Sequence, residues 1–287
     1  MIQRVKKGFK KRVSAIFDTR IYKNNETVSC QKNADIAVVL HLFYPEMWAY
    51  FENELRNLGE YDLFITVPLS KKELVPQGLT NKGTVFYVPN RGRDVLPFLY
   101  VIKRIHPMGY RAILKLHSKK SPHYKEGDIW LNSMVRSLTN AKTKVIKELF
   151  QNQDTIVGPA GHFTSLEVNF EANGKKLEKI LFRSTTKGRV QRMTQRDRAK
   201  HGFFAGTMFW ISPGLAADAV YNVPLHRFDV EGGQIDGTYA HAIERAFCLL
   251  PQLRGEKLYE VNEKGTIIEV DVSSGAIPEW SDKYSGK

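Results

Sequence analysis

Residues 34–68 read ADIAVVLHLFYPEMWAYFENELRNLGEYDLFITVP, and this stretch decides the fold. The apolar run at 36–40 is typical of a strand that is buried on both faces. Apolar side chains then recur at steps of three and four, which predicts a helix that ends near Gly59. These side chains are Met47, Trp48, Phe51, Leu55 and Leu58. A second apolar run follows at 63–67, and a strand, a helix and a strand in this order indicate parallel pairing.

The same alternation continues along the chain. Further strands are predicted at 85–88, 112–116, 155–157 and 203–211, and further helices at 95–105, 130–150 and 236–250. This pattern predicts an α/β fold with a mostly parallel, doubly wound sheet. Ligands of such sheets bind at the carboxyl ends of the strands. We therefore expect one α/β domain over residues 34–251, with its site at that edge.

Two stretches lie outside this domain. Residues 1–33 predict a basic N-terminal arm, and residues 252–287 predict a hairpin, 257–261 with 266–270, followed by a tail. Residues 1–17 carry apolar side chains at helical spacing among Lys and Arg, the pattern of a helix that lies on an anionic membrane. The alternative is a basic tail, or a helix packed on the domain. No apolar run reaches the roughly 20 residues that a membrane-spanning helix needs.

The composition narrows the classes of function. Of 287 residues, 42% are hydrophobic and 25% are charged, as in ordinary globular proteins. The net charge of +13 attracts polyanions, among them nucleic acid, anionic lipid and phosphorylated substrates. Cys30 and Cys248 form no spacing motif, which argues against a disulfide scaffold and a zinc site. A cytoplasmic protein is the expectation, with the inner face of the cell membrane as its place if residues 1–17 bind the membrane.

A basic cluster, NRGRD at 90–94, follows the strand predicted at 85–88. A glycine between two arginines lets the backbone turn sharply and approach a ligand. The two guanidinium groups are suited to phosphate oxygens, and the carboxylate to an arginine or a sugar hydroxyl. The alternative for that carboxylate is a cap on the next helix. The predicted donor-binding residues of this cluster are Asn90, Arg91, Arg93 and Asp94.

A second cluster, KLHSKKS at 115–121, ends the strand predicted at 112–116. Lys115 stands inside a run that should be buried, so its ammonium needs a carboxylate or phosphate partner. The pair at 119–120 is either solvated or binds an anion, and we favour the anion because the strand ends there. His41 ends the first strand in the same way, with a structural role as its alternative. The residues predicted here to bind the donor are His41, Lys115, His117, Lys119 and Lys120.

A third cluster is EGGQIDGTYAHAIER at 231–245. Its two carboxylates, Asp236 and Glu231, precede and begin a helix, and either can act as a general base toward a hydroxyl. Asp236 is the first choice for the base and Glu231 the second; the alternative for Asp236 is the helix N-cap. Trp210, Tyr239 and His241 are predicted to bind an acceptor sugar, whereas Phe209 is expected in the core.

The common phosphate and metal signatures are absent from the sequence. There is no GxxxxGK[ST], no GxGxxG after a strand and no HExxH. No Asp-x-Asp pair follows the strand at 112–116, where a divalent metal would be held. We therefore expect no metal or other cofactor, with a divalent ion as the less favoured alternative. Residues 183–202 are strongly basic and predict a loop that closes over the donor or contacts the acceptor.

Several of these motifs together resemble the rhamnan synthesis protein F family over about residues 34–251. They are HLFYPEMW (41–48), YDLFITVP (61–68), VPNRGRD (88–94), ILKLHSKKS (113–121), VGP (157–159), FFAGTMFW (203–210) and EGGQIDGTYAHAIER (231–245). The resemblance implies a glycosyltransferase in the synthesis of rhamnose-rich or O-antigen surface polysaccharides of bacteria. Its implied partners are a nucleoside-diphosphate sugar and a lipid-linked or growing saccharide.

The layout also resembles the A-type glycosyltransferases. In this chain LKLHSKK (114–120) stands at the place of their metal motif, and Asp236 at the place of their base. Fixed Lys, Arg and His cations can take over the charge of a metal beside a departing diphosphate. The resemblance therefore implies metal-independent transfer, and a single base without a covalent nucleophile implies inversion at the anomeric carbon.

Two other classes of function stay open at this point. A nucleic-acid-binding protein would fit the net charge, but no recognition motif is visible and the charge is dispersed, so we expect no nucleic-acid partner. A non-catalytic saccharide-binding or scaffold domain of a synthesis complex is the second alternative.

Overall fold

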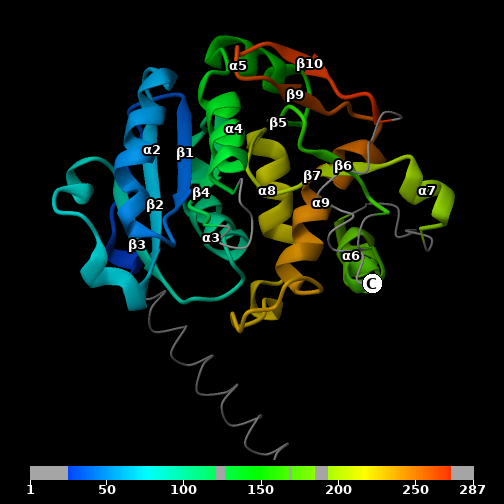
Figure 1. Cartoon of the computed structure of the whole chain (residues 1–287), viewed down its shortest axis with the longest axis horizontal. Helices are drawn as coiled ribbons and strands as arrows, with labels where there is room; N and C mark the ends of the chain where they lie inside the picture. Colours follow the sequence, from blue (N-terminus) through cyan, green and yellow to red (C-terminus); the bar gives the residue numbers. More distant parts are fainter. Residues whose placement is uncertain (1–24, 121–126, 168–169, 185–192, 273–287) are drawn as a thin grey trace, which may run out of the picture.

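The computed structural model describes residues 25–120, 127–167, 170–184 and 193–272, and the structural statements below concern these residues. Its centre is one eight-stranded sheet with the order β10-β9-β5-β8-β4-β1-β2-β3 (Figure 1). The strands are β1 (Ile36–His41), β2 (Asp62–Pro68), β3 (Thr84–Val88), β4 (Ala112–His117), β5 (Ile156–Pro159), β8 (Phe209–Ile211), β9 (Tyr259–Val261) and β10 (Ile267–Glu269). A separate antiparallel pair consists of β6 (Phe163–Ser165) and β7 (Gly202–Phe204).

Most neighbouring strands in the large sheet run parallel. β3, β2, β1 and β4 form one parallel block, and β9 runs parallel to β5. β8 lies antiparallel between β4 and β5, and β10 lies antiparallel to β9 at the edge. The predicted mostly parallel α/β sheet is therefore confirmed.

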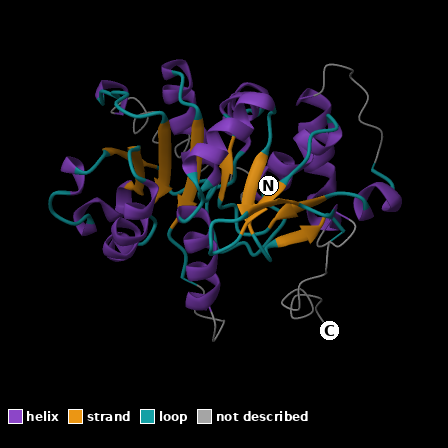
Figure 2. Ribbon diagram, turned by 90° about the horizontal axis from the view of Figure 1, so that it is seen from above, coloured by secondary structure: helices purple, strands orange, loops and turns teal. Residues whose placement is uncertain are grey.

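Helices cover both faces of this sheet, as Figure 2 shows. One face packs against α2 (Trp48–Leu55), α4 (Gly127–Thr139) and α5 (Thr143–Asn152). The other packs against α3 (Val95–Ile105), α6 (Phe170–Ser184), α8 (Pro213–Asn222) and α9 (Tyr239–Leu253). A short helix, α7 (Gln195–Ala199), follows α6 in the chain. Successive strand residues alternate between the two cores, with Val38 in one and Val39 in the other, because side chains along a strand point to opposite faces.

Two predicted elements are divided in the structure. The helix expected at 130–150 is two helices, α4 and α5, because Lys142 has an extended backbone (ψ 103°) that interrupts the helical path. The strand expected at 203–211 is two strands in two sheets, β7 and β8. Between them Gly206 (φ 97°) and Thr207 (φ 53°) turn the chain in a conformation that no strand adopts.

The two ends of the described chain are tied to the domain. The predicted C-terminal hairpin is confirmed as β9 and β10, but it extends the central sheet and is not a separate unit. Asn25 Nδ2 donates to the Tyr87 carbonyl (2.6 Å), and the Asn33 N–H donates to Asp62 (2.8 Å), so residues 25–33 pack on the domain. The helix predicted at 1–17 lies outside the described residues. Within them, no helix has the length and apolarity needed to cross a membrane.

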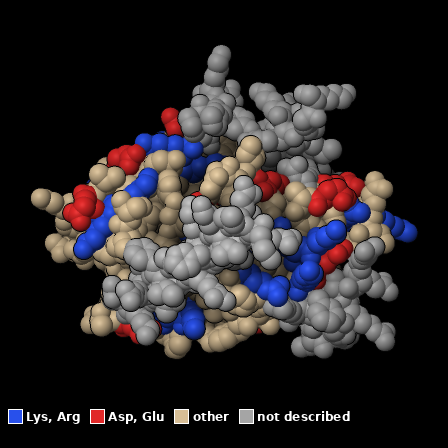
Figure 3. All heavy atoms as spheres, turned by 90° about the horizontal axis from the view of Figure 1, so that it is seen from below, with Lys and Arg blue, Asp and Glu red and all other residues tan. Residues whose placement is uncertain are grey.

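Opposite charges lie close together on the surface. On the face in Figure 3, described Lys and Arg side chains form separate groups with Asp and Glu between them. Two ion pairs of the described residues illustrate this: Arg198 lies 3.0 Å from Glu171, and Lys257 lies 2.7 Å from Glu269. Part of the positive charge is therefore neutralised locally.

Candidate active site

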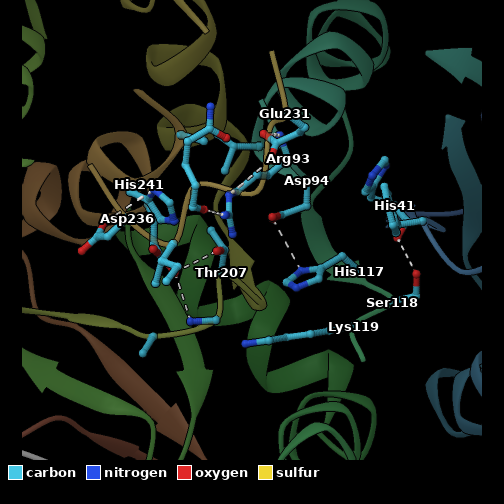
Figure 4. Close-up of a pocket in the computed structure, with 18 of the residues that line it drawn as sticks. His41, Arg93, Asp94, His117, Ser118, Lys119, Thr207, Glu231, Asp236 and His241 are labelled. Atoms are coloured by element: carbon cyan, nitrogen blue, oxygen red, sulfur yellow. Dashed lines mark hydrogen bonds and ion pairs between the residues drawn. The ribbon is translucent and has the colours of Figure 1, made fainter. Parts of the chain in front are cut away.

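A pocket of about 690 Å³ lies at the carboxyl edge of the parallel strands, where the sequence predicts a site. Its walls come from the ends of β1 and β4, the segment before α3, the turn between β7 and β8, and the start of α9 (Figure 4). The predicted site residues that line it are His41, Asn90, Arg93, Asp94, His117, Lys119, Lys120, Glu231, Asp236 and His241.

The structure does not bring the other predicted site residues to the pocket wall. Arg91 Nε donates to the Phe228 carbonyl (2.8 Å). Trp210 is fully buried and its indole N–H donates to the Leu138 carbonyl (2.9 Å). Tyr239 is buried with its ring edge-on to Phe228. The prediction that Trp210 and Tyr239 bind an acceptor sugar is therefore wrong, because both rings are used in packing.

Lys115 lies beneath the pocket floor. Its side chain is 1% exposed, its ammonium is hydrogen-bonded to the Asp94 carboxylate, and it donates to the Thr207 carbonyl (2.6 Å). The carboxylate partner predicted for this buried cation is thus confirmed. Asp94 makes no side-chain cap bond to α3, so the capping alternative is wrong. Because Lys115 is committed to this ion pair, it is not available to a ligand phosphate.

The two histidines at the strand ends are uncharged at neutral pH. Burial lowers the pKa of His41 to about 4 and the pKa of His117 to about 3, and the nearby Asp94 carboxylate only partly offsets this. The expectation that histidine cations contribute charge to the site is therefore wrong. Both rings can still donate and accept hydrogen bonds.

Lys119 brings a cation into the pocket. Its ammonium lies 3.9 Å from the centre of the Trp130 ring, and it forms no hydrogen bond or ion pair with any described residue. Burial lowers the pKa of this lysine. Lys120, in contrast, is exposed and lies 2.5 Å from Glu46. A half-buried ammonium that lacks a carboxylate partner can bind the anionic group of a ligand.

The backbone is strained at two points of the pocket wall. Arg93 (φ 54°) and Thr207 (φ 53°) are the non-glycine residues with positive φ in the described part of the chain. Such conformations cost on the order of 1–3 kcal/mol each and cluster at functional sites. Lys115 holds both turns, since it binds the Thr207 carbonyl and Asp94, the neighbour of Arg93. Gly92 (φ 66°) allows the predicted sharp turn, because a Cβ there would lie 2.6 Å from the Phe228 ring.

Of the two predicted carboxylates, Asp236 is the more heavily bonded. Its Oδ1 accepts from Asn173 Nδ2 (3.0 Å) and from the Gly237 N–H (2.7 Å), and its Oδ2 lies 3.6 Å from the buried Arg245. The N-cap of α9 is Thr238, so the capping role considered for Asp236 is wrong.

Glu231 keeps one carboxylate oxygen freer. Its Oε1 accepts from the Arg93 N–H (3.0 Å), whereas its Oε2 lies 3.7 Å from Arg93 Nε without hydrogen-bond geometry. Burial raises the pKa of Glu231 above its usual value, despite the neighbouring Arg93. A carboxylate with a raised pKa is the better proton acceptor.

The sequence reasoning gave no role to three residues of the pocket wall, Thr207, Glu244 and Arg245. Glu244 Oε1 accepts from the Gly206 N–H (3.0 Å) and from the Thr207 hydroxyl (2.9 Å), and so ties the strained turn to α9. The spacing in the sequence could have identified two of them, because Glu244 and Arg245 follow His241 at helical steps of three and four and so lie on the same side of the helix. Within the described residues, no group of three or more His, Cys, Asp or Glu side chains is placed to hold a metal ion.

Comparison with known proteins places the chain in a family. Residues 1–255 match rhamnan synthesis protein F. The chain belongs to this family. The rhamnan synthesis protein F match contains every residue that lines the pocket. No solved structure matches the chain.

The chain is also similar to two curated relatives. The chain is 30% identical over 247 residues to the uncharacterized protein WxcX of Xanthomonas campestris pv. campestris, in strain B100 and in strain ATCC 33913. The match covers 83% of this chain and 34% of each relative. The chain therefore spans about a third of the length of these relatives.

Proposed function

We propose that this chain is a glycosyltransferase domain that moves a sugar from a nucleoside-diphosphate sugar to a growing bacterial surface polysaccharide. Membership of the rhamnan synthesis protein F family supports the role in polysaccharide synthesis and makes rhamnose the first candidate sugar. The observation that carries the proposal is the Lys119 ammonium, which lies in the pocket without a carboxylate partner and in the same pocket as the carboxylate of Glu231. A transferase needs this combination of an anion-binding cation and a base.

The donor diphosphate would bind to Lys119, with Arg93 and Lys120 on the same pocket wall. These side chains carry the positive charge that a departing nucleoside diphosphate requires. Lys115 and Arg91 take no part, because neither side chain lines the pocket and both are bonded elsewhere. With the charge supplied by fixed cations, the proposed transfer needs no divalent metal.

Glu231 would remove the proton from the acceptor hydroxyl, which then attacks the anomeric carbon of the donor sugar as the diphosphate leaves. We assign the base to Glu231 and not to Asp236, because the raised pKa and the freer Oε2 favour Glu231. Asp236 positions Arg245 and the loop before α9 through its contacts. One base and no covalent nucleophile give inversion. The acceptor would be a growing or lipid-linked saccharide at the cytoplasmic side of the membrane.

Lys119→Met is expected to weaken the binding of the sugar nucleotide by about 10- to 100-fold, the effect of losing one hydrogen bond between charged groups. Isothermal titration calorimetry with UDP-, GDP- and dTDP-linked sugars measures this. Lys82→Met is the matched control, because Lys82 is a surface lysine paired with Glu52 (2.9 Å) outside the pocket. Equal affinities of the two variants would contradict the proposed diphosphate site.

A further inference from the structure

His41 and His117 stand side by side at the end of the parallel block. They are register partners at the ends of β1 and β4. Register partners point to the same face of a sheet, and neighbouring strands are about 4.8 Å apart. Both side chains are nearly buried, at 7% and 8% exposed, and both line the pocket (Figure 4).

Each imidazole is oriented from its Nδ1 side. His41 Nδ1 is hydrogen-bonded to the Thr66 hydroxyl (2.9 Å). His117 Nδ1 faces the Asp94 carboxylate at 3.5 Å, and no hydrogen bond forms at this distance. No hydrogen bond between described residues uses the Nε2 of either ring. The two Nε2 atoms are therefore available to a ligand.

The charges around His41 and His117 indicate which kind of ligand group the two rings can bind. Asp94 and Lys115 act on both rings, Lys71 acts on His41 and Lys119 on His117, and burial keeps the rings neutral. Neutral imidazoles do not balance the negative charge of a phosphate. They can, however, donate hydrogen bonds to hydroxyl groups and accept hydrogen bonds from them. The charge for the phosphates lies on the neighbouring Lys119 instead.

We infer that His41 and His117 form the subsite for the sugar ring of the donor and bind its hydroxyls through Nε2, an inference that rests on the proposed function. Side chains that project from neighbouring strands, about 4.8 Å apart, can reach two hydroxyls of the same pyranose ring. His41 and His117 are thus specificity-determining residues. A site that bonds hydroxyls in this way rejects sugars that lack them.

The test compares binding of a sugar nucleotide with binding of its nucleoside diphosphate. His41→Asn and His117→Asn keep a polar group near Thr66 and Asp94 but remove the atom at the Nε2 position. Each is expected to bind the UDP-, GDP- or dTDP-linked sugar about 10-fold more weakly and the free UDP, GDP or dTDP within about twofold of wild type. His106→Asn is the control, because His106 follows α3 at the end away from the pocket.

Different outcomes separate the inference from the proposed function. Equal weakening of the sugar nucleotide and the nucleoside diphosphate would overturn the inference, as would unchanged binding of both. If wild type binds neither ligand, the proposed function itself fails. For variants that do not fold, NMR of the wild type replaces the titration: the His41 and His117 ring signals should shift with the sugar nucleotide and not with the nucleoside diphosphate. Equal shifts with both would contradict the inference.

Discussion

Asp94→Asn is expected to lower the free energy of unfolding by about 3–5 kcal/mol, because it leaves the Lys115 ammonium buried without a counter-charge. Lys115 is 1% exposed and sits between the rings of Phe98 and Phe209, where water cannot reach it. Urea unfolding followed by circular dichroism measures the loss. The double variant Asp94→Asn, Lys115→Met is the control, since it removes both charges and should recover most of the stability. A single variant as stable as wild type would show that the ion pair does not hold the site.

The loss of stability in Asp94→Asn is predicted to depend on pH. Burial alone would raise the pKa of Asp94, but His117, which is protonated only at low pH, and Lys115 together outweigh burial and hold the pKa well below its usual range. A lowered folded-state pKa means that the unfolded chain takes up protons first as the pH falls. The difference in stability between wild type and Asp94→Asn should therefore be constant above about pH 5 and shrink below about pH 4, where the unfolded carboxylate is protonated.

Glu231→Gln is expected to reduce kcat by about 10²- to 10⁴-fold, the usual contribution of a general base, while donor binding changes little. The neutral amide keeps an oxygen for the Arg93 N–H but cannot take the proton. Release of nucleoside diphosphate and extension of a saccharide acceptor measure the turnover. Because burial raises the pKa of Glu231, the acid limb of the wild-type rate profile should lie above the ordinary glutamate value.

Asp236→Asn is the comparison variant that tests whether Glu231 or Asp236 is the general base. It weakens the contact with Arg245 and should lower stability more than Glu231→Gln does, with a smaller loss of kcat. If Asp236→Asn alone abolishes turnover, the base is Asp236. If both variants leave polysaccharide synthesis unchanged, the domain binds or organises saccharide without catalysis.

Much of the fold could be predicted because its signals are local. The runs at 36–40 and 63–67 are strands of the parallel block, and α3 begins and ends where its apolar pattern does. The predictions failed where distant contacts decide the structure. α6 has a polar surface and packs on α9 with one apolar stripe, and the turn at 205–207 depends on Lys115 and Glu244.

The sequence predicts where the site lies more readily than it predicts the role of each residue in it. The rule that ligands bind at strand ends identifies the residues that line the pocket, such as His41, His117 and Lys119. It does not distinguish side chains that face the pocket from those beneath it, as with Lys115. It also does not reveal that burial removes the charge of the two histidines, because burial is decided by the packing of the folded chain and not by the neighbouring sequence.

The measurement that tests the central claim most directly is the melting temperature of the wild-type protein with a panel of nucleoside-diphosphate sugars, each with and without Mg²⁺ or Mn²⁺. A ligand that binds only the folded protein raises the melting temperature by mass action. We predict that one sugar nucleotide raises it clearly, that the metal makes no difference, and that the shift is markedly smaller in Lys119→Met. No shift with any member of the panel, with or without metal, would contradict the proposal that this domain binds a sugar nucleotide.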